Sequence, residues 1–315
     1  MRVVFMGTPE YGLASLRALL EAGHEVAGVL TQPDKPKGRG GRMAQPPVKA
    51  FALERGIPVF QPASARREGA GILQRLKPEV CVTAAYGQIL PEEMLAVPPL
   101  GTVNVHASLL PGYRGPAPVN WAIIRGETVT GVTTMLTDRG VDTGDILLQE
   151  KTGIGPEETA GELTGRLALL GASLLVRTLS CLPGGGCPRR PQNEEEMSYF
   201  PMLRRETGRV DWRQGAGQIA DLARGLNPWP GAYSASPWGT LKILSAQALP
   251  DGSRAAPGDV LAADQRDGLV VRAGDGAVRL RLLQAPGGRA MPDTDFLRGH
   301  PAPVGARMGT EGEDA

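Results

Sequence analysis

The chain of 315 residues carries 34 Lys and Arg against 33 Asp and Glu, which gives a formal net charge of +1. This length suggests about two domains and is ample for a hydrophobic core. The balanced charge excludes an acidic tail protein and a polycation, so any nucleic-acid partner must bind a local patch.

The three cysteines, Cys81, Cys181 and Cys187, are odd in number and form no C-x-x-C pair. A disulfide framework is therefore not expected, and the pattern suits a reducing compartment. The N-terminus is too short in its apolar part for a signal peptide, and no run approaches the ~20 apolar residues of a membrane helix. We expect a cytoplasmic protein that does not contact a membrane.

The first half of the chain alternates short apolar runs with helical patterns. Residues 3–6 form an apolar run of strand type, and Thr8 then stands where it can cap a helix whose leucines recur at helical spacing. Further strands are predicted at 26–30, 58–60, 80–85, 102–106, 131–136 and 146–149. Helices are predicted at 47–55, 71–76, 92–96, 116–125 and 157–179. This alternation predicts an α/β fold with a parallel sheet covered on both faces.

The second half of the chain differs in pattern. Residues 181–204 begin with many helix breakers and without periodicity, which predicts a linker after a first domain at 1–180. From residue 205 the pattern is of β type, with strands predicted at 241–244, 269–272 and 278–282. Short strands at this spacing predict a small β-barrel over 205–308, followed by a frayed tail at 309–315.

Polar groups gather at residues 104–115, which read N-V-H-A-S-L-L-P-G-Y-R-G. Asn104 and His106 are two apart in a predicted strand and therefore point to the same face, at the end of the strand where open parallel sheets bind ligands. An amide beside an imidazole can stabilise an oxyanion and move a proton. A satisfied core histidine next to a turn asparagine explains the same spacing equally well.

Carboxylates lie on a glycine-rich loop at residues 138–145, D-R-G-V-D-T-G-D. One of Asp138, Asp142 and Asp145 near His106 would orient the ring and favour its protonated form. Turn chemistry alone also explains Asp and Gly in such a loop. The sequence pattern does not choose among the three aspartates.

Residues 34–49 are basic and hold no acid after Asp34. Their glycines and prolines exclude a helix before residue 47 and favour a flexible loop that binds phosphate, with a solvated surface loop as the alternative. The turn G-T-P-E-Y-G at 7–12 lacks the G-x-G-x-x-G spacing, so a nicotinamide site is not expected. The distant histidines and the cysteine spacing predict no metal site.

Two segments, N-V-H-A-S-L-L-P-G-Y-R-G-P-A-P and D-R-G-V-D-T-G-D, closely resemble the folate-dependent formyltransferases. The resemblance extends along the whole chain through V-F-M-G-T-P-E, T-Q-P-D-K-P-K-G-R-G, A-A-Y-G-Q-I-L-P, N-P-W-P-G-A-Y and F-L-R-G-H-P. These pieces narrow it to the branch that formylates methionyl-tRNA. The resemblance implies a Rossmann-like first domain, whose mostly parallel sheet has an antiparallel part, and an OB-like C-terminal domain that binds tRNA.

The implied activity is transfer of a formyl group from 10-formyltetrahydrofolate to the α-amino group of methionine on initiator tRNA, for translation initiation, without a metal and by a monomer. The family's catalytic residues fall on Asn104, His106 and Asp142. Its folate-binding segment falls on Ser108, Leu109, Leu110 and Pro111. The tRNA-binding loop implies roles for Lys35, Lys37, Arg39, Arg42 and Lys49, with Arg39 matching a functionally important arginine.

Three alternatives remain open at this point. A sister enzyme that formylates an amino sugar on a nucleotide would share the three catalytic residues but should not need the basic loop or the C-terminal barrel. A formyltetrahydrofolate hydrolase would use water as the acceptor and release formate. A non-catalytic RNA-binding protein would lose no activity in an Asp142→Asn variant. Departures from the family pattern are modest, with Ala107 where glycine is common and an unusual stretch at 184–190.

Overall fold

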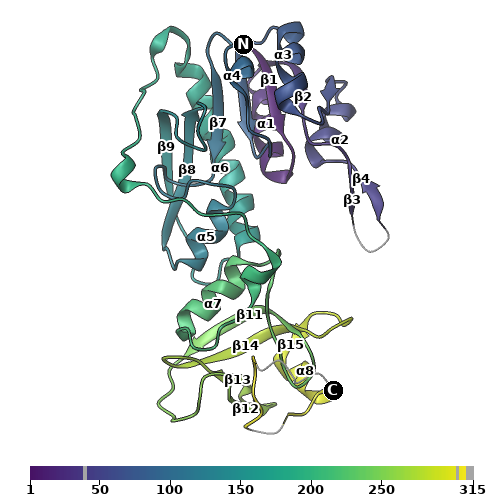
Figure 1. Ribbon diagram of the computed structural model, residues 1–315, viewed down its shortest axis with the longest axis vertical. Coiled ribbons are helices and arrows are strands. Elements are labelled where there is room, and N and C mark those ends of the chain that lie inside the picture. Colours follow the sequence, from purple (N-terminus) through teal and green to yellow (C-terminus); the bar gives the residue numbers. More distant parts are fainter. Residues whose placement is uncertain (38–40, 303–304, 310–315) are drawn as a thin grey trace. The chain divides into compact units, whose positions relative to one another are not determined.

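The computed structural model describes residues 1–37, 41–302 and 305–309, which fall into two compact units (Figure 1). The first unit comprises Met1–Pro118, Val129–Gly153 and Thr164–Phe200. The second comprises Val119–Thr128, Ile154–Leu163 and Pro201–Ala315. The units are interleaved along the chain, because two short segments from its first half belong to the second unit. The domain limits expected at residues 180 and 205 stay a prediction.

A seven-stranded sheet forms the centre of the first unit, in the order β5-β2-β1-β6-β7-β8-β9. Five strands are parallel, and β8 and β9 add an antiparallel edge next to β7. This confirms the α/β, Rossmann-like class and the mixed sheet that the family resemblance implies. The strands are β1 (Arg2–Gly7), β2 (Glu25–Leu30), β5 (Val59–Phe60), β6 (Val80–Ala84), β7 (Thr102–His106), β8 (Val129–Leu136) and β9 (Ile146–Gly153).

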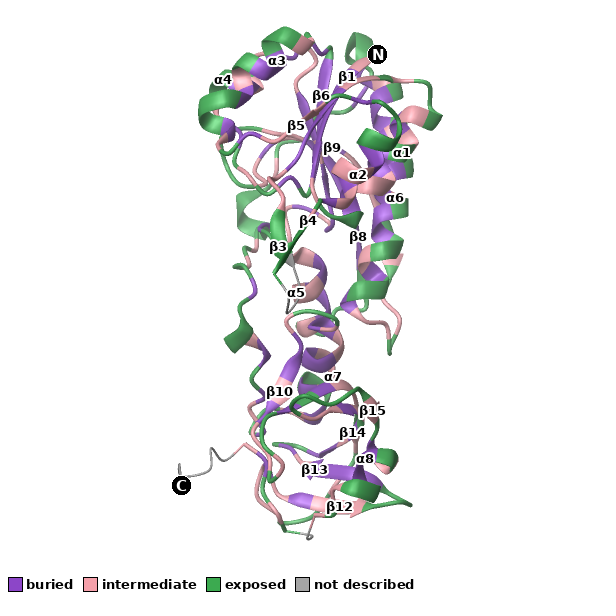
Figure 2. Ribbon diagram, turned by 90° about the vertical axis from the view of Figure 1, so that its right-hand side faces the viewer, coloured by how far each residue is buried: buried purple, intermediate pink, exposed green. Residues whose placement is uncertain are grey.

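Helices cover both faces of this sheet, whose central strands are buried (Figure 2). Val4 and Met6 of β1 pack with residues of α3 and α4 on one face, and alternation along the strand turns Phe5 to the other face. There Gly12 of α1 approaches Phe5, and Gly171 of α6 approaches Val105. The helices of this unit are α1 (Glu10–Glu21), α2 (Pro47–Glu54), α3 (Ala70–Leu76), α4 (Glu92–Leu95) and most of α6 (Ala160–Cys181), with a π-helical turn at Ala65–Gly69. Helix α5 (Pro118–Ile124) belongs almost entirely to the second unit.

The start of α1 differs from the expectation. Pro9 occupies the N-cap position, and no side chain caps the helix there. The Thr8 hydroxyl donates instead to the carbonyl oxygen of Tyr86, at 2.9 Å. The predicted cap is therefore wrong, because Thr8 is used to join the end of β1 to the loop after β6.

Helix α6 has the length and composition to cross a membrane, which corrects the expectation that no segment does. Half of its apolar window is buried inside the structure, and its leucines at 167, 174, 175 and 179 are fully buried. On that buried side the Thr178 hydroxyl lies 2.7 Å from the hydroxyl of Thr134 in β8. A helix buried in a protein core passes the same test of length and composition, so α6 is weak evidence for a membrane span.

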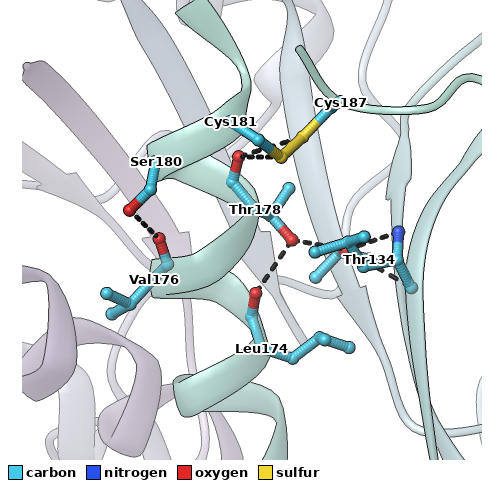
Figure 3. The surroundings of a disulfide bond; sticks show 8 residues. Thr134, Leu174, Val176, Thr178, Ser180, Cys181 and Cys187 are labelled. Carbon is cyan, nitrogen blue, oxygen red and sulfur yellow. Dashed lines mark hydrogen bonds between the residues drawn. A yellow bond between two sulfur atoms is a disulfide. The ribbon is translucent and has the colours of Figure 1, made fainter.

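A disulfide joins Cys181, the last residue of α6, to Cys187 (Figure 3). The 3-10 turn Pro183–Gly185 folds the chain back and brings the two Cα atoms to 4.9 Å. The expectation of unpaired cysteines is therefore wrong, because a tight turn pairs residues whose spacing matches no familiar motif. Cys81 is the free cysteine, and burial raises the pKa of its thiol to about 12.

An antiparallel sheet of six strands forms the second unit, in the order β10-β11-β14-β13-β12, with β15 paired to β14. Among the described residues no pairing joins β10 to β12, so the sheet is open and a closed barrel is not confirmed. The β-type reading also missed α7, whose Ile219 and Leu222 are buried at helical spacing between glycines. The elements are β10 (Ala232–Ser234), β11 (Leu241–Leu249), β12 (Val260–Asp264), β13 (Gly268–Arg272), β14 (Ala277–Gln284), β15 (Met291–Pro292), α7 (Ala216–Gly225) and α8 (Asp293–Gly299).

The disulfide gives a direct test. Because it closes a loop between residues six apart in sequence, its reduction should lower the free energy of unfolding by about 2 kcal/mol. Denaturant unfolding with and without dithiothreitol measures this change. A Cys187→Ser variant should have the free energy of unfolding of the reduced protein, and dithiothreitol should not change it. Alkylation of the unfolded, unreduced chain should modify Cys81 alone, and modification of Cys181 as well would contradict the bond.

Candidate active site

Strand β7 supplies the amide of the candidate site. In the register between β6 and β7, Asn104 lies beside Thr83. The Thr83 hydroxyl donates to Oδ1 of Asn104 at 2.9 Å. The amide nitrogen consequently faces Oδ1 of Asp142, at 3.5 Å. This orientation is chemically required, because a carboxylate only accepts hydrogen bonds and must meet the NH2 side of an amide.

The imidazole of His106 is almost fully buried and has a partner at each nitrogen. Nε2 lies 3.0 Å from the carbonyl oxygen of Tyr113, which can only accept a hydrogen bond, so Nε2 carries the proton in that bond. Nδ1 lies 3.5 Å from Oδ1 of Asp142. A ring with protons on both nitrogens would donate to both partners. The distance to the carboxylate is long for a hydrogen bond and leaves that contact easily exchanged.

The carboxylate of Asp142 is fixed from its other side. Oδ2 accepts from the backbone N–H of Gly115 at 2.9 Å. Position 115 must be glycine, because φ is +107° and an added Cβ would lie 2.3 Å from the carbonyl oxygen of Phe200. Asp142 itself has a φ of +56°, a left-handed conformation that is uncommon for non-glycine residues, although Asn and Asp adopt it more readily than most.

The structure therefore brings Asn104, His106 and Asp142 together and chooses among the three aspartates. Asp138 accepts from the N–H of Gly140 and from the hydroxyl of Thr143, which is turn chemistry within an exposed loop. The backbone carbonyl of Asp145 accepts from Leu136 at the base of the same loop.

The expected folate-binding segment follows His106 and is held by hydrogen bonds within the loop and to β8. The Ser108 hydroxyl donates to the carbonyl of Gly112 at 2.7 Å, and the N–H of Leu110 donates to the Thr133 hydroxyl at 3.1 Å. Ser108 and Leu110 are buried, whereas Leu109 and Pro111 are partly exposed. The segment thus offers a ligand a fixed loop with two apolar side chains at its surface.

The structure describes contacts for some of the expected tRNA-binding residues. A short hairpin, β3 (Lys35–Lys37) with β4 (Arg42–Ala44), replaces part of the predicted flexible loop. Lys35 and Arg42 are exposed on it. The ammonium of Lys49 instead lies 2.7 Å from Asp34, and its hydrogen bond lowers the pKa of that carboxyl. Arg39 lies outside the described residues, and of Lys37 only the backbone is described.

Four polar residues of this region were not foreseen as parts of the site: Thr83, Arg114, Gln192 and Glu194. Thr83 lies within the apolar strand β6 and shows no signal by itself. Arg114 is only 2% exposed and bonds to Gln192 and Glu194. Both partners lie in the segment that composition predicts as a linker, and a buried arginine close to the Asn104–His106 motif was the one available signal that such partners exist.

Two family descriptions match the chain: "Formyl transferase" over residues 1–179 and "Formyl transferase, C-terminal domain" over residues 202–301. Among the described residues, no group of three or more His, Cys, Asp or Glu could hold a metal ion.

Curated relatives match over almost the full length. Methionyl-tRNA formyltransferase from Ruminiclostridium cellulolyticum is 44% identical over 98% of this chain and 100% of the relative. The enzyme of the same name from Syntrophus aciditrophicus is 48% identical over 98% of each chain. The chain therefore belongs to the formyl transferase family, and these relatives place it in the methionyl-tRNA formyltransferase branch.

Solved structures share the fold at low sequence identity. An N-formyltransferase from Helicobacter canadensis, in complex with folinic acid and dTDP-3-aminofucose, aligns with a TM-score of 0.67 at 19% identity, covering 88% of this chain and 97% of that one. HypX from Aquifex aeolicus, in complex with tetrahydrofolic acid, aligns with a TM-score of 0.63 at 20% identity, covering 94% of this chain and 47% of that one.

The Thr83–Asn104 contact predicts a measurable effect. A Thr83→Val variant keeps the shape of the side chain but releases Oδ1 of Asn104, so the amide nitrogen loses its fixed direction. We expect formyl transfer to fall roughly tenfold. Steady-state kinetics measure this, and Thr83→Ser, which keeps the hydroxyl, should stay close to the parent. Equal rates for Val and the parent would show that the contact does not orient the amide.

Proposed function

We propose that the chain transfers the formyl group of 10-formyltetrahydrofolate to the α-amino group of methionine on initiator methionyl-tRNA. The observation that carries this proposal is the convergence of an amide, an imidazole and a carboxylate at one point. Oδ1 of Asp142 lies 3.5 Å from both Nδ2 of Asn104 and Nδ1 of His106. Family membership and the names of the full-length relatives support the acceptor.

The chemistry needs groups that these three residues supply. The free amine adds to the formyl carbon and gives a tetrahedral intermediate with a negative oxygen. The amide of Asn104 and a protonated His106 donate to that oxygen, exchanging their long contacts with Asp142 for shorter ones. Asp142 then balances the charge of His106 and positions a water that carries the amine proton to N10 of the departing folate. No covalent enzyme intermediate is formed.

The folate is proposed to lie against Ser108, Leu109, Leu110 and Pro111. The apolar side chains of Leu109 and Pro111 are the partly exposed members of this segment. Hydrogen bonds from the Ser108 hydroxyl to Gly112 and from Leu110 to Thr133 of β8 already hold this loop, which is therefore pre-formed. A pre-formed loop loses little conformational entropy when a ligand binds.

We propose that tRNA phosphates bind Lys35, Lys37, Arg39 and Arg42. Lys49 pairs with Asp34 and so anchors one end of this basic segment to the other. We further propose that the antiparallel sheet of the second unit acts as an OB-like tRNA-binding domain in a monomeric enzyme. We propose a cytoplasmic location because translation initiation takes place there. The cysteines no longer support this location, because two of them form a disulfide.

A second candidate acceptor is an amino sugar on a nucleotide, because solved structures with the same fold include an N-formyltransferase bound to dTDP-3-aminofucose and a sugar 3N-formyltransferase. An incubation of the protein with 10-formyltetrahydrofolate and one acceptor at a time distinguishes the candidates. The acceptors are methionyl initiator tRNA, methionyl elongator tRNA and a nucleotide-linked amino sugar. N-formylmethionine on initiator tRNA supports the proposal. A formylated sugar supports the rival, and formate without an acceptor supports a hydrolase.

Removal of either donor should slow the reaction. One oxyanion donor is typically worth about a hundredfold in turnover, so Asn104→Ala and His106→Ala should each lose at least that much. Initial rates of N-formylmethionyl-tRNA formation measure the loss, with thermal unfolding as the check on folding. A folded variant with a near-normal rate would overturn the assignment of that residue.

The basic segment should act on tRNA and not on folate. Arg39→Ala should raise the KM for methionyl-tRNA and weaken the dependence of tRNA binding on salt, because one phosphate contact is lost. Binding of 10-formyltetrahydrofolate, measured by calorimetry, should be unchanged. Arg75→Ala, at an exposed arginine of α3 in the first unit that lies outside the proposed binding segments, is the charge-matched control. Unaltered tRNA kinetics in the Arg39 variant would remove the loop from the proposal.

A further inference from the structure

Residues 190–200 run alongside the candidate site and pair with its backbone. Arg190 exchanges two backbone hydrogen bonds with Ile146, at 2.9 and 3.0 Å. The N–H of Arg114 donates to the carbonyl of Ser198, and its own carbonyl accepts from Phe200. The segment thus joins the start of β9 to the loop after β7. All of these residues belong to the first unit.

Gln192 is the residue of this segment that contacts the aspartate loop. Its amide nitrogen donates to the backbone carbonyls of Asp142 and Gly144, each at 2.8 Å. Its Oε1 accepts from Nε and Nη2 of Arg114, at 3.1 and 2.9 Å. Both N–H groups and the oxygen of the carboxamide are therefore in use.

The buried charge of Arg114 fixes which way this carboxamide points. A guanidinium has only donors, so it must face the oxygen of Gln192, and the amide nitrogen must then face the loop. Glu194 also pairs with Arg114, at 2.8 Å, but its side chain is 67% exposed. The buried guanidinium of Arg114 therefore determines the orientation of the Gln192 carboxamide.

The loop that carries Asp142 needs a residue that fixes its backbone conformation. A non-glycine residue at a positive φ, as Asp142 is, stores backbone strain and persists where its surroundings determine its conformation. Gln192 binds the peptide carbonyl of Asp142 itself and a second carbonyl two residues later. The chain between them cannot rotate without breaking one of these bonds, and rotation there would swing the carboxylate away from Asn104 and His106.

We propose that Gln192 is a positioning residue that holds the Asp142 loop in its active conformation, a role that rests on the catalytic function proposed above for Asp142. Gln192 touches no reacting atom. It acts through the backbone of Asp142, and Arg114 acts through Gln192.

The sharpest variant is Gln192→Glu. A glutamate still accepts from Arg114, so the size, shape and buried pairing are kept, but it presents an oxygen where two carbonyls need a donor. We expect kcat for formylation of methionyl-tRNA to fall about tenfold or more, since a misplacement of ~1 Å can cost a hundredfold. The KM values for tRNA and for 10-formyltetrahydrofolate should stay within about threefold, because the proposed binding segments are untouched.

The matched control is Asn193→Asp, the same amide-to-acid change on the next residue. The Asn193 side chain is exposed and bonds within its own turn, to Glu195 and Glu196. It should leave kcat and both KM values at parental levels. If Gln192→Glu fails to fold, Gln192→Met removes the donors without adding a charge, and the same selective loss of kcat is expected from it.

A double-mutant cycle separates positioning from general stability. When the carboxylate is removed by Asp142→Ala, there is nothing left for Gln192 to position, so adding Gln192→Glu should lower kcat little further. A loss of the same factor in both backgrounds would overturn the proposal, as would parental kcat in the folded Gln192 variants. If Asp142→Ala alone keeps parental kcat, the proposed role of Asp142 fails first, and that result is read from the single variant.

Discussion

The carboxylate of Asp142 is the group on which the geometry of the site depends. It only accepts hydrogen bonds, so each neighbour must present an N–H, and this orients the amide of Asn104, the ring of His106 and the backbone of Gly115 at once. One of these contacts is short, at 2.9 Å to Gly115, and two are long, at 3.5 Å. The short contact anchors the carboxylate. In the mechanism proposed here, the long contacts leave the two donors free to turn toward a developing oxyanion, as catalysis by differential binding requires.

The antiparallel edge of the sheet explains how a distant loop reaches β7. The register places Leu136, the last residue of β8, beside Val103, one residue before Asn104. The loop that follows β8 therefore begins next to the strand that carries the other two groups. A purely parallel sheet would send the chain into a helix at this point. The loop is also tight, because a Cβ at Gly144 would lie 1.7 Å from the carbonyl of Leu136.

The sequence alone predicted the elements of the first unit well, because their apolar periodicity is local. It placed Asn104 and His106 on one face of a strand, which the structure confirms. The residue pattern could not choose Asp142 among the three aspartates, since that choice depends on where a loop folds in space, and only the family resemblance pointed to it. It missed α7, whose glycines lower the apparent helical signal, and the Cys181–Cys187 bond, which depends on a turn. The use of Thr8 outside a helix cap is likewise a contact between distant segments.

The segment from 181 to 200 shows that a stretch without periodicity can still be held in place by specific contacts. Periodicity detects elements that bury an apolar face, and this segment is held instead by hydrogen bonds to backbone carbonyls and to Arg114. Such contacts leave no repeat in the sequence. The first family match ends at residue 179, yet the polar network behind Asp142 is completed at Gln192. A catalytic fragment defined by the match alone would thus keep Asn104, His106 and Asp142 and lose the side chain that contacts the loop from behind.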